Sequence, residues 1–252
     1  MSDLQTAAQR VASASSVAVL TGAGVSKESG VPTFRDALEG LWAQYDPTQL
    51  ATPNAFQANP KLVWDWYEYR RQMVANVQPN PGHHALADLE QHASNLVVIT
   101  QNVDDLHEKA GSTDVIHLHG NIAGHKCFYD CQGTPTRVDI SQLEYDEGPP
   151  ACPHCGRRSV RAAVVWFGES LPQAALGRAV HLAQTCDVML VVGTSGLVTP
   201  AATLPSIAKD AGAFTIEVNP DDSALTHLMD IKLSGPSGEM LPKLLEALKR
   251  AS

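Results

Sequence analysis

Four of the five cysteines in this 252-residue chain lie in two close pairs. The pairs are Cys127 with Cys131, and Cys152 with Cys155. Two pairs of thiolates at such short spacings are typical of tetrahedral zinc, and four thiolates leave no coordination position open for catalysis. The sequence therefore predicts one structural Zn²⁺. His125 and His154 are near enough to serve as substitute ligands, and Cys186, which precedes an apolar run, is expected to be an inert buried thiol.

Two histidines, His117 and His119, occupy alternate positions around Leu118. In an extended segment both imidazoles would face the same side. An imidazole can accept a proton near neutral pH because its ordinary pKa is about 6.5. From the residues alone, the pair could bind a metal, supply a general base or be structural.

A glycine-bearing turn follows the first apolar run, SVAVL at 16–20. Gly22 and Gly24 would let the backbone turn tightly and approach a pyrophosphate, with the following N–H groups as donors. The spacing departs from the dinucleotide fingerprint, because Lys27 stands where the third glycine is expected. That departure disfavours a hydride-transferring dehydrogenase. A plain glycine turn remains the alternative.

Further apolar runs are predicted to be buried strands, and helical patterns separate them. The strand-like runs are 96–100, 187–193 and 214–218, and the helical patterns are 4–14, 172–185, 201–211 and 239–250. This alternation predicts an α/β fold with a Rossmann-like, doubly wound parallel sheet. The turn-rich stretch 121–162 and the helical stretch 43–87 interrupt it. We expect them to form a smaller helical and zinc-binding domain, and 1–42, 88–120 and 163–252 to form the sheet domain.

One helix of the predicted insertion carries a further pattern. Asn59 and Pro60 predict its start. We expect a buried stripe composed of Leu62, Trp66, Tyr69, Met73 and Val77. Tyr67 and Arg70 would lie beside this stripe, one turn apart. An arginine binds a carboxylate through two hydrogen bonds, and the tyrosine hydroxyl would add a third donor. The alternative is an ordinary exposed arginine.

The composition limits the partners and the compartment. The formal net charge is −9 and the pI is near 5.5, which disfavours nucleic acid as the main ligand and favours a cationic protein or peptide. No apolar run approaches the ~20 residues of a membrane helix, and residues 1–16 lack the apolar core of a secretory signal. We therefore expect a cytoplasmic protein that does not bind membranes.

Five motifs in order along the chain resemble those of the sirtuin family. They are GAGVSKESGVPTFRD (22–36), TQNVDDLHEKAG (100–111), HLHG (117–120), VVWFGE (164–169) and GTSGLVTPA (193–201). The resemblance covers about residues 16–238. It implies a protein-lysine deacylase that consumes NAD, holds one structural zinc and acts on acyl-lysine proteins or peptides. The implied products are free lysine, nicotinamide and O-acyl-ADP-ribose. An ADP-ribosyltransferase with the same NAD site and a non-catalytic NAD-sensing module are the alternatives.

The resemblance also implies roles for individual residues. His119, directly before a glycine, would be the catalytic base, with Asn102 and Asp104 as the other catalytic residues. The residues implied to bind NAD are Gly22, Ala23, Gly24, Ser29, Phe34, Arg35, Gln101, Asn102, Asp104, Gly193, Thr194, Ser195, Asn219 and Ser237. Asn102 and Asp104 could instead cap a helix that starts near Asp105.

The substrate residues are implied in the same way. Val165, Trp166, Phe167 and Gly168 would flank the acyl-lysine tunnel, with the backbone pairing to an extended peptide. Tyr67 and Arg70 look like the pair found in sirtuins that remove succinyl and malonyl groups. The first cysteine pair departs from the usual family pattern, because it encloses three residues where sirtuins usually have two.

Overall fold

The structure is a computed structural model that describes residues 2–32 and 45–251. The chain divides into two compact units. The first contains the described parts of Met1–Thr33, Gln78–Leu118 and Pro172–Ser252, and the second the described parts of Phe34–Val77 and His119–Leu171. Each unit is therefore assembled from segments that are distant in sequence.

The first unit is built on a parallel sheet, which has six strands among the described residues. In chain order these are β1 (Val17–Thr21), β2 (Leu96–Thr100), β3 (Val115–His117), β6 (Val188–Val192), β7 (Phe214–Asn219) and β8 (Ile231–Ser234). Their order in the sheet is β3-β2-β1-β6-β7-β8. The order reverses at β1, and Thr21 is level with Thr100 on one side and Val192 on the other. In open α/β sheets, ligands bind at such a reversal, beyond the carboxyl ends of the strands.

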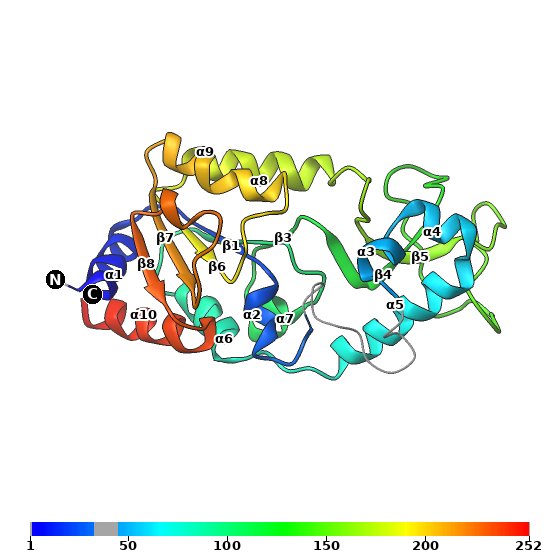
Figure 1. The fold of residues 1–252 in the computed structure, drawn as a ribbon, viewed down its shortest axis with the longest axis horizontal. Helices are drawn as coiled ribbons and strands as arrows, with labels where there is room; N and C mark the ends of the chain where they lie inside the picture. Colours follow the sequence, from blue (N-terminus) through cyan, green and yellow to red (C-terminus); the bar gives the residue numbers. More distant parts are fainter. Residues whose placement is uncertain (1, 33–44, 252) are drawn as a thin grey trace. The chain divides into compact units, whose positions relative to one another are not determined.

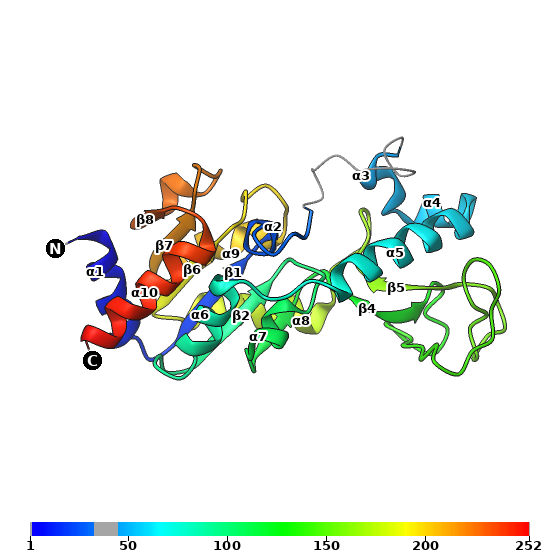
Figure 2. The ribbon, with the colours of Figure 1, turned by 90° about the horizontal axis from the view of Figure 1, so that it is seen from below.

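Helices cover both faces of this sheet (Figures 1 and 2). On one face lie α1 (Asp3–Ser13), α6 (Pro81–Leu89) and α10 (Ser237–Ala251), and on the other α8 (Gln173–Thr185) and α9 (Leu204–Asp210). Every residue of β1, β2 and β6 is buried, as expected for strands covered on both sides. Two short helices, α2 (Ala23–Lys27) and α7 (Leu106–Ala110), follow β1 and β2. Short 3₁₀ turns lie at Ala201–Thr203 and Thr226–Leu228.

The predicted Rossmann-like class is confirmed. The apolar runs form β1, β2, β6 and β7, and the helical patterns form α1, α8, α9 and α10. Two strands were not predicted, β3 and β8. Both are short, and their residues are mostly half-buried, so they lack a continuous apolar signal.

The second unit combines helices with a two-stranded antiparallel sheet. Its elements are α3 (Pro47–Leu50), α4 (Pro53–Ala58), α5 (Pro60–Ala75), β4 (Gly120–Cys127) and β5 (Val160–Val164). The predicted start of α5 is confirmed, because the Asn59 side chain accepts a hydrogen bond from the N–H of Leu62 and Pro60 takes the first helical position.

The predicted buried stripe of α5 is wrong in most of its members. The buried residues of this helix are Val63, Trp64, Trp66, Tyr67 and Val74. Leu62, Tyr69, Met73 and Val77 are only half-buried. The helix buries a second side because Trp64 packs into a small core with Cys127, Val138, Cys152 and Val160. Tyr67 therefore lies within the packed face and not beside it.

Within residues 2–32 and 45–251, no helix is both long and apolar enough to cross a bilayer.

Candidate functional site

The turn after β1 packs directly against the end of β6. Gly24 N–H donates to the carbonyl of Gly193 at 2.8 Å, and Gly22 N–H donates to Val192 at 3.0 Å. A methyl group on Gly24 would lie 2.7 Å from the Gly193 oxygen, closer than real contacts allow. Glycine is therefore required here by the close approach of two backbones, in addition to any ligand.

The polar residues that follow β2 face this turn. Asn102 donates from its amide to the Gly22 carbonyl (3.2 Å) and to the Ser26 hydroxyl (3.0 Å). Gln101 donates to the Thr194 hydroxyl at 3.0 Å. The loops after β1, β2 and β6 thus bring predicted NAD residues into mutual contact at the carboxyl edge of the sheet. This is the position at which the fold binds ligands.

Asp104 is 4% exposed, and burial raises the pKa of its carboxyl above the usual range. Its Oδ1 accepts a hydrogen bond from Leu106 N–H at 3.2 Å, at the start of α7. The N-cap of α7 is Asp105, whose side chain makes no capping hydrogen bond, so Asp104 supports only the first N–H of the helix from the residue before the N-cap. The same carboxyl could also bind a ligand amide, because a carboxylate has more acceptor sites than one N–H occupies.

Three other predicted NAD residues form hydrogen bonds within the first unit. Asn219, at the end of β7, donates to the Thr194 carbonyl at 2.9 Å. Ser29 accepts from the Asn80 amide at 2.9 Å. Ser237 donates its hydroxyl to Glu28 at 2.9 Å, and the same carboxylate accepts from Gly238 N–H. Glu28 was not singled out from the sequence, because only the tertiary structure places it at the start of α10.

Ala23 and Gly24 form the first turn of α2, and Ser195 follows Thr194 in the loop after β6. Phe34 and Arg35 lie outside the described residues.

His117 closes β3, and its Nε2 lies 2.6 Å from the Glu108 carboxylate. Its Nδ1 lies 3.4 Å from the carbonyl of Asn102. Burial alone would lower the pKa of His117, but the hydrogen bond to Glu108 and its charge, together with the Asn102 carbonyl and the Asp104 charge, raise the pKa above its ordinary value. Of the three roles that the sequence left open for His117, this pairing favours the structural one, beside Asn102.

In the second unit, His119 immediately precedes β4. Its carbonyl accepts a hydrogen bond from Val165 N–H at 2.8 Å, just after β5. Gly120 pairs with Val164 across the two strands. The backbone of the predicted base is therefore fixed to the predicted substrate segment.

The residues of the predicted substrate segment, 165–168, differ in their exposure to solvent. Trp166 is 2% exposed, whereas Phe167 is 48% exposed. Val165 is half-buried and Gly168 is exposed. The N–H of Phe167 donates to the Ala51 carbonyl at 2.9 Å. Of the four residues, Trp166 packs inward and Phe167 presents a large apolar surface.

Tyr67 and Arg70 are brought together on α5, as their spacing predicted. The guanidinium carbon of Arg70 lies 6.0 Å from the Tyr67 ring centre and 5.0 Å from that of Trp66. Tyr67 is 2% exposed, and burial raises its pKa to about 12, so its hydroxyl stays protonated at neutral pH. Its oxygen accepts a hydrogen bond from the Trp166 indole at 2.9 Å.

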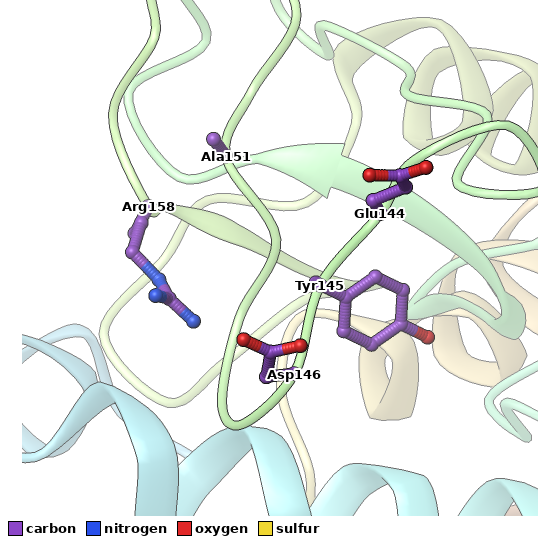
Figure 3. Close-up of a pocket in the computed structure, with 5 residues that line it drawn as sticks. All are labelled: Glu144, Tyr145, Asp146, Ala151 and Arg158. Atoms are coloured by element: carbon purple, nitrogen blue, oxygen red, sulfur yellow. The ribbon is translucent and has the colours of Figure 1, made fainter.

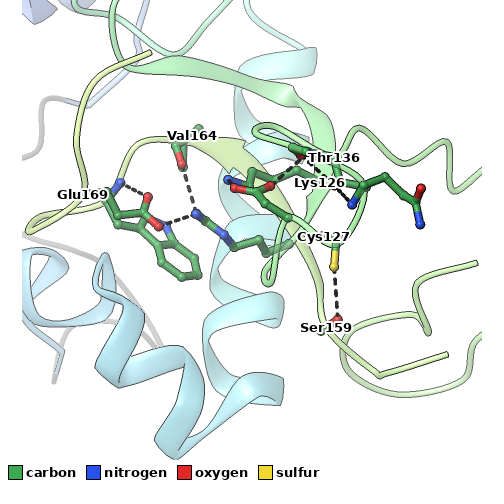
Figure 4. A network of polar contacts seen from close by, with 11 residues as sticks. Lys126, Cys127, Thr136, Ser159, Val164 and Glu169 are labelled. Atoms are coloured by element: carbon green, nitrogen blue, oxygen red, sulfur yellow. Dashed lines mark hydrogen bonds and ion pairs between the residues drawn. The ribbon is translucent and has the colours of Figure 1, made fainter. Parts of the chain in front are cut away.

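The four paired cysteines converge in the second unit. Their sulfur atoms all lie within 4.8 Å of one another. Two of the separations are 3.9 Å (Cys127 to Cys155) and 3.8 Å (Cys131 to Cys152). A tetrahedron of sulfurs about 2.3 Å from zinc has edges of about 3.8 Å, so these residues fit zinc. His125 and His154 are not in this cluster. Ser159 adds a hydroxyl 3.7 Å from the Cys127 sulfur (Figure 4).

A pocket in the second unit has a volume of 310 Å³ and is lined by Glu144, Tyr145, Asp146, Ala151 and Arg158 (Figure 3). All five residues are exposed, and none was predicted as a site residue. Arg158 is already engaged with the backbone carbonyls of Glu147 and Pro149.

The doubly wound sheet, the glycine turn at its reversal point and the four-thiolate cluster define a class of protein. A family model described as "Sir2 family" matches residues 22–200, which is more than half of the chain. The chain therefore belongs to the Sir2 family, and the sirtuin resemblance of the motifs is confirmed.

Individual relatives extend the match to nearly the whole chain. A Pseudomonas aeruginosa protein named NAD-dependent protein deacylase 1 is 52% identical over 239 residues, covering 93% of this chain and 95% of the relative. NAD-dependent protein deacylase 2 of Pyrobaculum aerophilum is 50% identical, covering 96% and 95%.

Solved structures agree. A crystal structure of a Sir2 homolog–NAD complex has a TM-score of 0.89 and 43% identity, covering 98% of this chain and 94% of that one. The protein Sir2Af2, bound to a myristoylated histone peptide, has a TM-score of 0.75 and 35% identity, covering 99% and 97%.

Proposed function

We propose that this chain is an NAD-dependent protein-lysine deacylase that removes acetyl groups and also succinyl and malonyl groups. The observation that supports it most directly is the contact of Gln101, Asn102 and Thr194 around the Gly22 turn, at the ligand edge of the sheet. The two relatives named NAD-dependent protein deacylases support the same activity. The homolog–NAD complex and the peptide-bound Sir2Af2 support NAD and an acyl-lysine peptide as the two substrates.

The binding roles follow from the chemistry of each residue. The backbone turn at Gly22–Gly24 would hold the pyrophosphate, since two glycines without side chains let a ligand approach the backbone at the reversal point of the sheet. Asn102 would hold the nicotinamide ribose, and Asp104 the carboxamide. Asn219 and Ser237 would serve the adenosine half. Arg35 would position NAD and Phe34 would shield the reacting carbon from water.

The reaction breaks the bond between nicotinamide and ribose as the acyl oxygen of the modified lysine attacks the ribose carbon. His119 then accepts the proton of a ribose hydroxyl, which attacks the acyl carbon. Water then adds to the acyl carbon, the lysine amine leaves, and the bond between the acyl carbon and the oxygen on the reacting ribose carbon breaks. The acyl group stays on ADP-ribose as an ester of the attacking hydroxyl. The zinc would hold the fold of the second unit without joining the reaction, because four thiolates fill its coordination.

We further assign the NAD site to the sheet domain and the reading of the acyl group to the smaller domain. The substrates of the enzyme would be acyl-lysine proteins in which cationic residues surround the modified lysine, because the chain carries a net charge of −9 and attracts cationic partners. We assign the enzyme to the cytoplasm, where thiols such as the four of the zinc cluster stay reduced.

The first experiment measures whether the wild-type chain deacylates peptides with NAD. Acetyl-, succinyl- and malonyl-lysine peptides are incubated with NAD, and nicotinamide and deacylated peptide are counted. We expect equal amounts of the two products. Nicotinamide release without deacylated peptide would instead indicate ADP-ribosyl transfer. His119→Ala should fold and bind NAD but lose about 10²–10⁴-fold in turnover, and unchanged turnover would refute its role.

The second experiment tests the acyl preference. A succinyl carboxylate must leave water to enter a buried pocket, and an unpaired buried charge costs several kcal/mol. Arg70 would offset this cost. We expect Arg70→Met to weaken succinyl and malonyl processing at least tenfold, since a charge-assisted bond contributes about 1.5–3 kcal/mol. Acetyl processing should stay similar or improve.

Arg71 provides a control on the same helix. Its Nε donates to the Ile122 carbonyl at 2.8 Å, and it pairs with Glu68. Arg71→Met removes the same charge, but it should reduce the processing of the succinyl peptide and of the acetyl peptide by the same factor. An equal loss on both peptides for Arg70→Met would mean that Arg70 supports the fold and does not read the acyl group.

A further inference from the structure

Trp166 connects the substrate segment to the helix that carries Tyr67 and Arg70. Its indole N–H donates to the Tyr67 oxygen at 2.9 Å, although 99 positions separate the two residues. Both side chains are 2% exposed. Water therefore does not compete for this hydrogen bond, which strengthens it.

The direction of this bond is fixed by chemistry. An indole N–H can only donate, so the Tyr67 oxygen must accept. A phenol has one proton, and in the part of the chain that the structure describes the indole is its only recorded hydrogen-bond partner. No acceptor among residues 2–32 and 45–251 uses the proton of Tyr67, so this proton can meet a further acceptor such as a bound ligand. A carboxylate is such an acceptor, whereas an acetyl methyl group is not.

Trp166 is itself held from several sides. Its backbone N–H donates to Glu169 at 2.8 Å. The guanidinium carbon of Arg161 lies 3.7 Å from the centre of its ring, a stacked cation–π contact. Arg161 is 1% exposed, pairs with Glu169 and donates to the Val164 carbonyl at 3.0 Å. The two acceptors, Val164 and Glu169, are labelled in Figure 4.

We propose that Trp166 is a positioning residue for acyl selectivity, which orients the Tyr67 hydroxyl so that its proton meets the distal carboxylate of a succinyl or malonyl group. The Arg161–Glu169 pair keeps the indole in the orientation required. This inference rests on the proposed succinyl and malonyl activity. It assigns Trp166 a task beyond lining the acyl-lysine tunnel.

The test compares Trp166→Phe, Tyr67→Phe and the double variant. The readout is the ratio of kcat/KM for a succinyl peptide to that for the matched acetyl peptide. A net neutral hydrogen bond changes such a ratio by roughly threefold to tenfold. We expect a fall of that size in each single variant, and no further fall when Trp166→Phe is added to Tyr67→Phe.

Packing changes are controlled with Phe56→Leu. The Phe56 ring lies 5.5 Å from the Trp166 ring and has no polar atom. This variant disturbs the same cluster and should leave the succinyl-to-acetyl ratio unchanged. If Trp166→Phe does not fold, Trp166→His replaces it, because its ring keeps an N–H. The succinyl-to-acetyl ratio of Trp166→His should then be well above the ratio of Tyr67→Phe. Equal ratios in these two variants would overturn the proposal.

The outcomes separate this inference from the proposed function. If the wild-type chain deacylates no peptide with NAD, the proposed function fails and the inference with it. If Arg70→Met lowers the ratio while Trp166→Phe lowers both substrates equally, only the inference fails. A further fall of the ratio in the double variant would also overturn it, because Trp166 would then act independently of the Tyr67 hydroxyl.

Discussion

Gly120, the residue after His119, offers a sharp test of how the predicted base is held. Its φ is +76°, in the left-handed region that favours glycine. A methyl group there would lie 2.2 Å from the carbonyl oxygen of Ala163 and 3.0 Å from the Cα of Val164. Both neighbours are backbone atoms of β5, so they cannot move aside without separating β4 from β5. Gly120→Ala is therefore expected to be strongly destabilising.

The magnitude has two parts, which a matched variant can separate. A left-handed conformation costs an L-residue about 1–2 kcal/mol. The clash with β5 adds about 1–3 kcal/mol, the usual range for overpacking. Gly156 has nearly the same φ, +72°, and nothing within 4 Å of the methyl position. Gly156→Ala should therefore lose only the conformational part, and Gly120→Ala about 2–5 kcal/mol in total.

The assay measures the free energy of unfolding in urea and the kcat of deacylation for both variants. Separation of the strands at Gly120 would also weaken the bond from Val165 N–H to the His119 carbonyl and displace the base. We expect kcat to fall about tenfold to a hundredfold in Gly120→Ala, since displacements near 1 Å have such effects. Equal stability losses in the two variants, with unchanged kcat, would refute the reasoning.

Three further predictions concern stability. Cys152→Ala should lose the single bound zinc and unfold at a lower temperature, whereas Cys186→Ala should keep the metal, because a structural zinc contributes directly to folding; metal analysis and thermal melts check both, and an unchanged zinc content in Cys152→Ala would contradict the four-thiolate site. Gly177→Ala, in α8 with nothing within 4 Å of the new methyl group, should stabilise the chain by about 0.5–1 kcal/mol, and a lower melting temperature would show that the position is not open. Burial lowers the pKa of His83 to about 3. Between that pH and about 6.5, His83 therefore stays neutral in the folded chain but is protonated in the unfolded chain. Stability contributed by neutral His83 should be complete above pH ~6.5 and fall by about 1.4 kcal/mol per unit on acidification toward the folded pKa. Urea unfolding at several pH values should show a slope smaller by about one proton in His83→Asn, and an identical slope would exclude this titration.

Much of the fold could be read from local patterns. The strand β2 is the run LVVIT, and a parallel strand covered on both faces shows itself as an unbroken apolar run. The start of α5 was visible because Asn59 and Pro60 act on their immediate neighbours. The zinc cluster was visible because two short cysteine spacings carry most of the geometry of the site.

What only the tertiary structure decided depends on residues that are distant in the chain. The buried face of α5 was mispredicted because Trp64 packs with Cys127 and Cys152, and helical periodicity contains no information about those partners. For the same reason, no local pattern shows that Glu28 meets Ser237 or that the Trp166 indole meets the Tyr67 hydroxyl. Spacing along the sequence determines the period of an element and its caps. Which side becomes buried, and which polar group is satisfied, is decided by the free energy of packing the folded segments together.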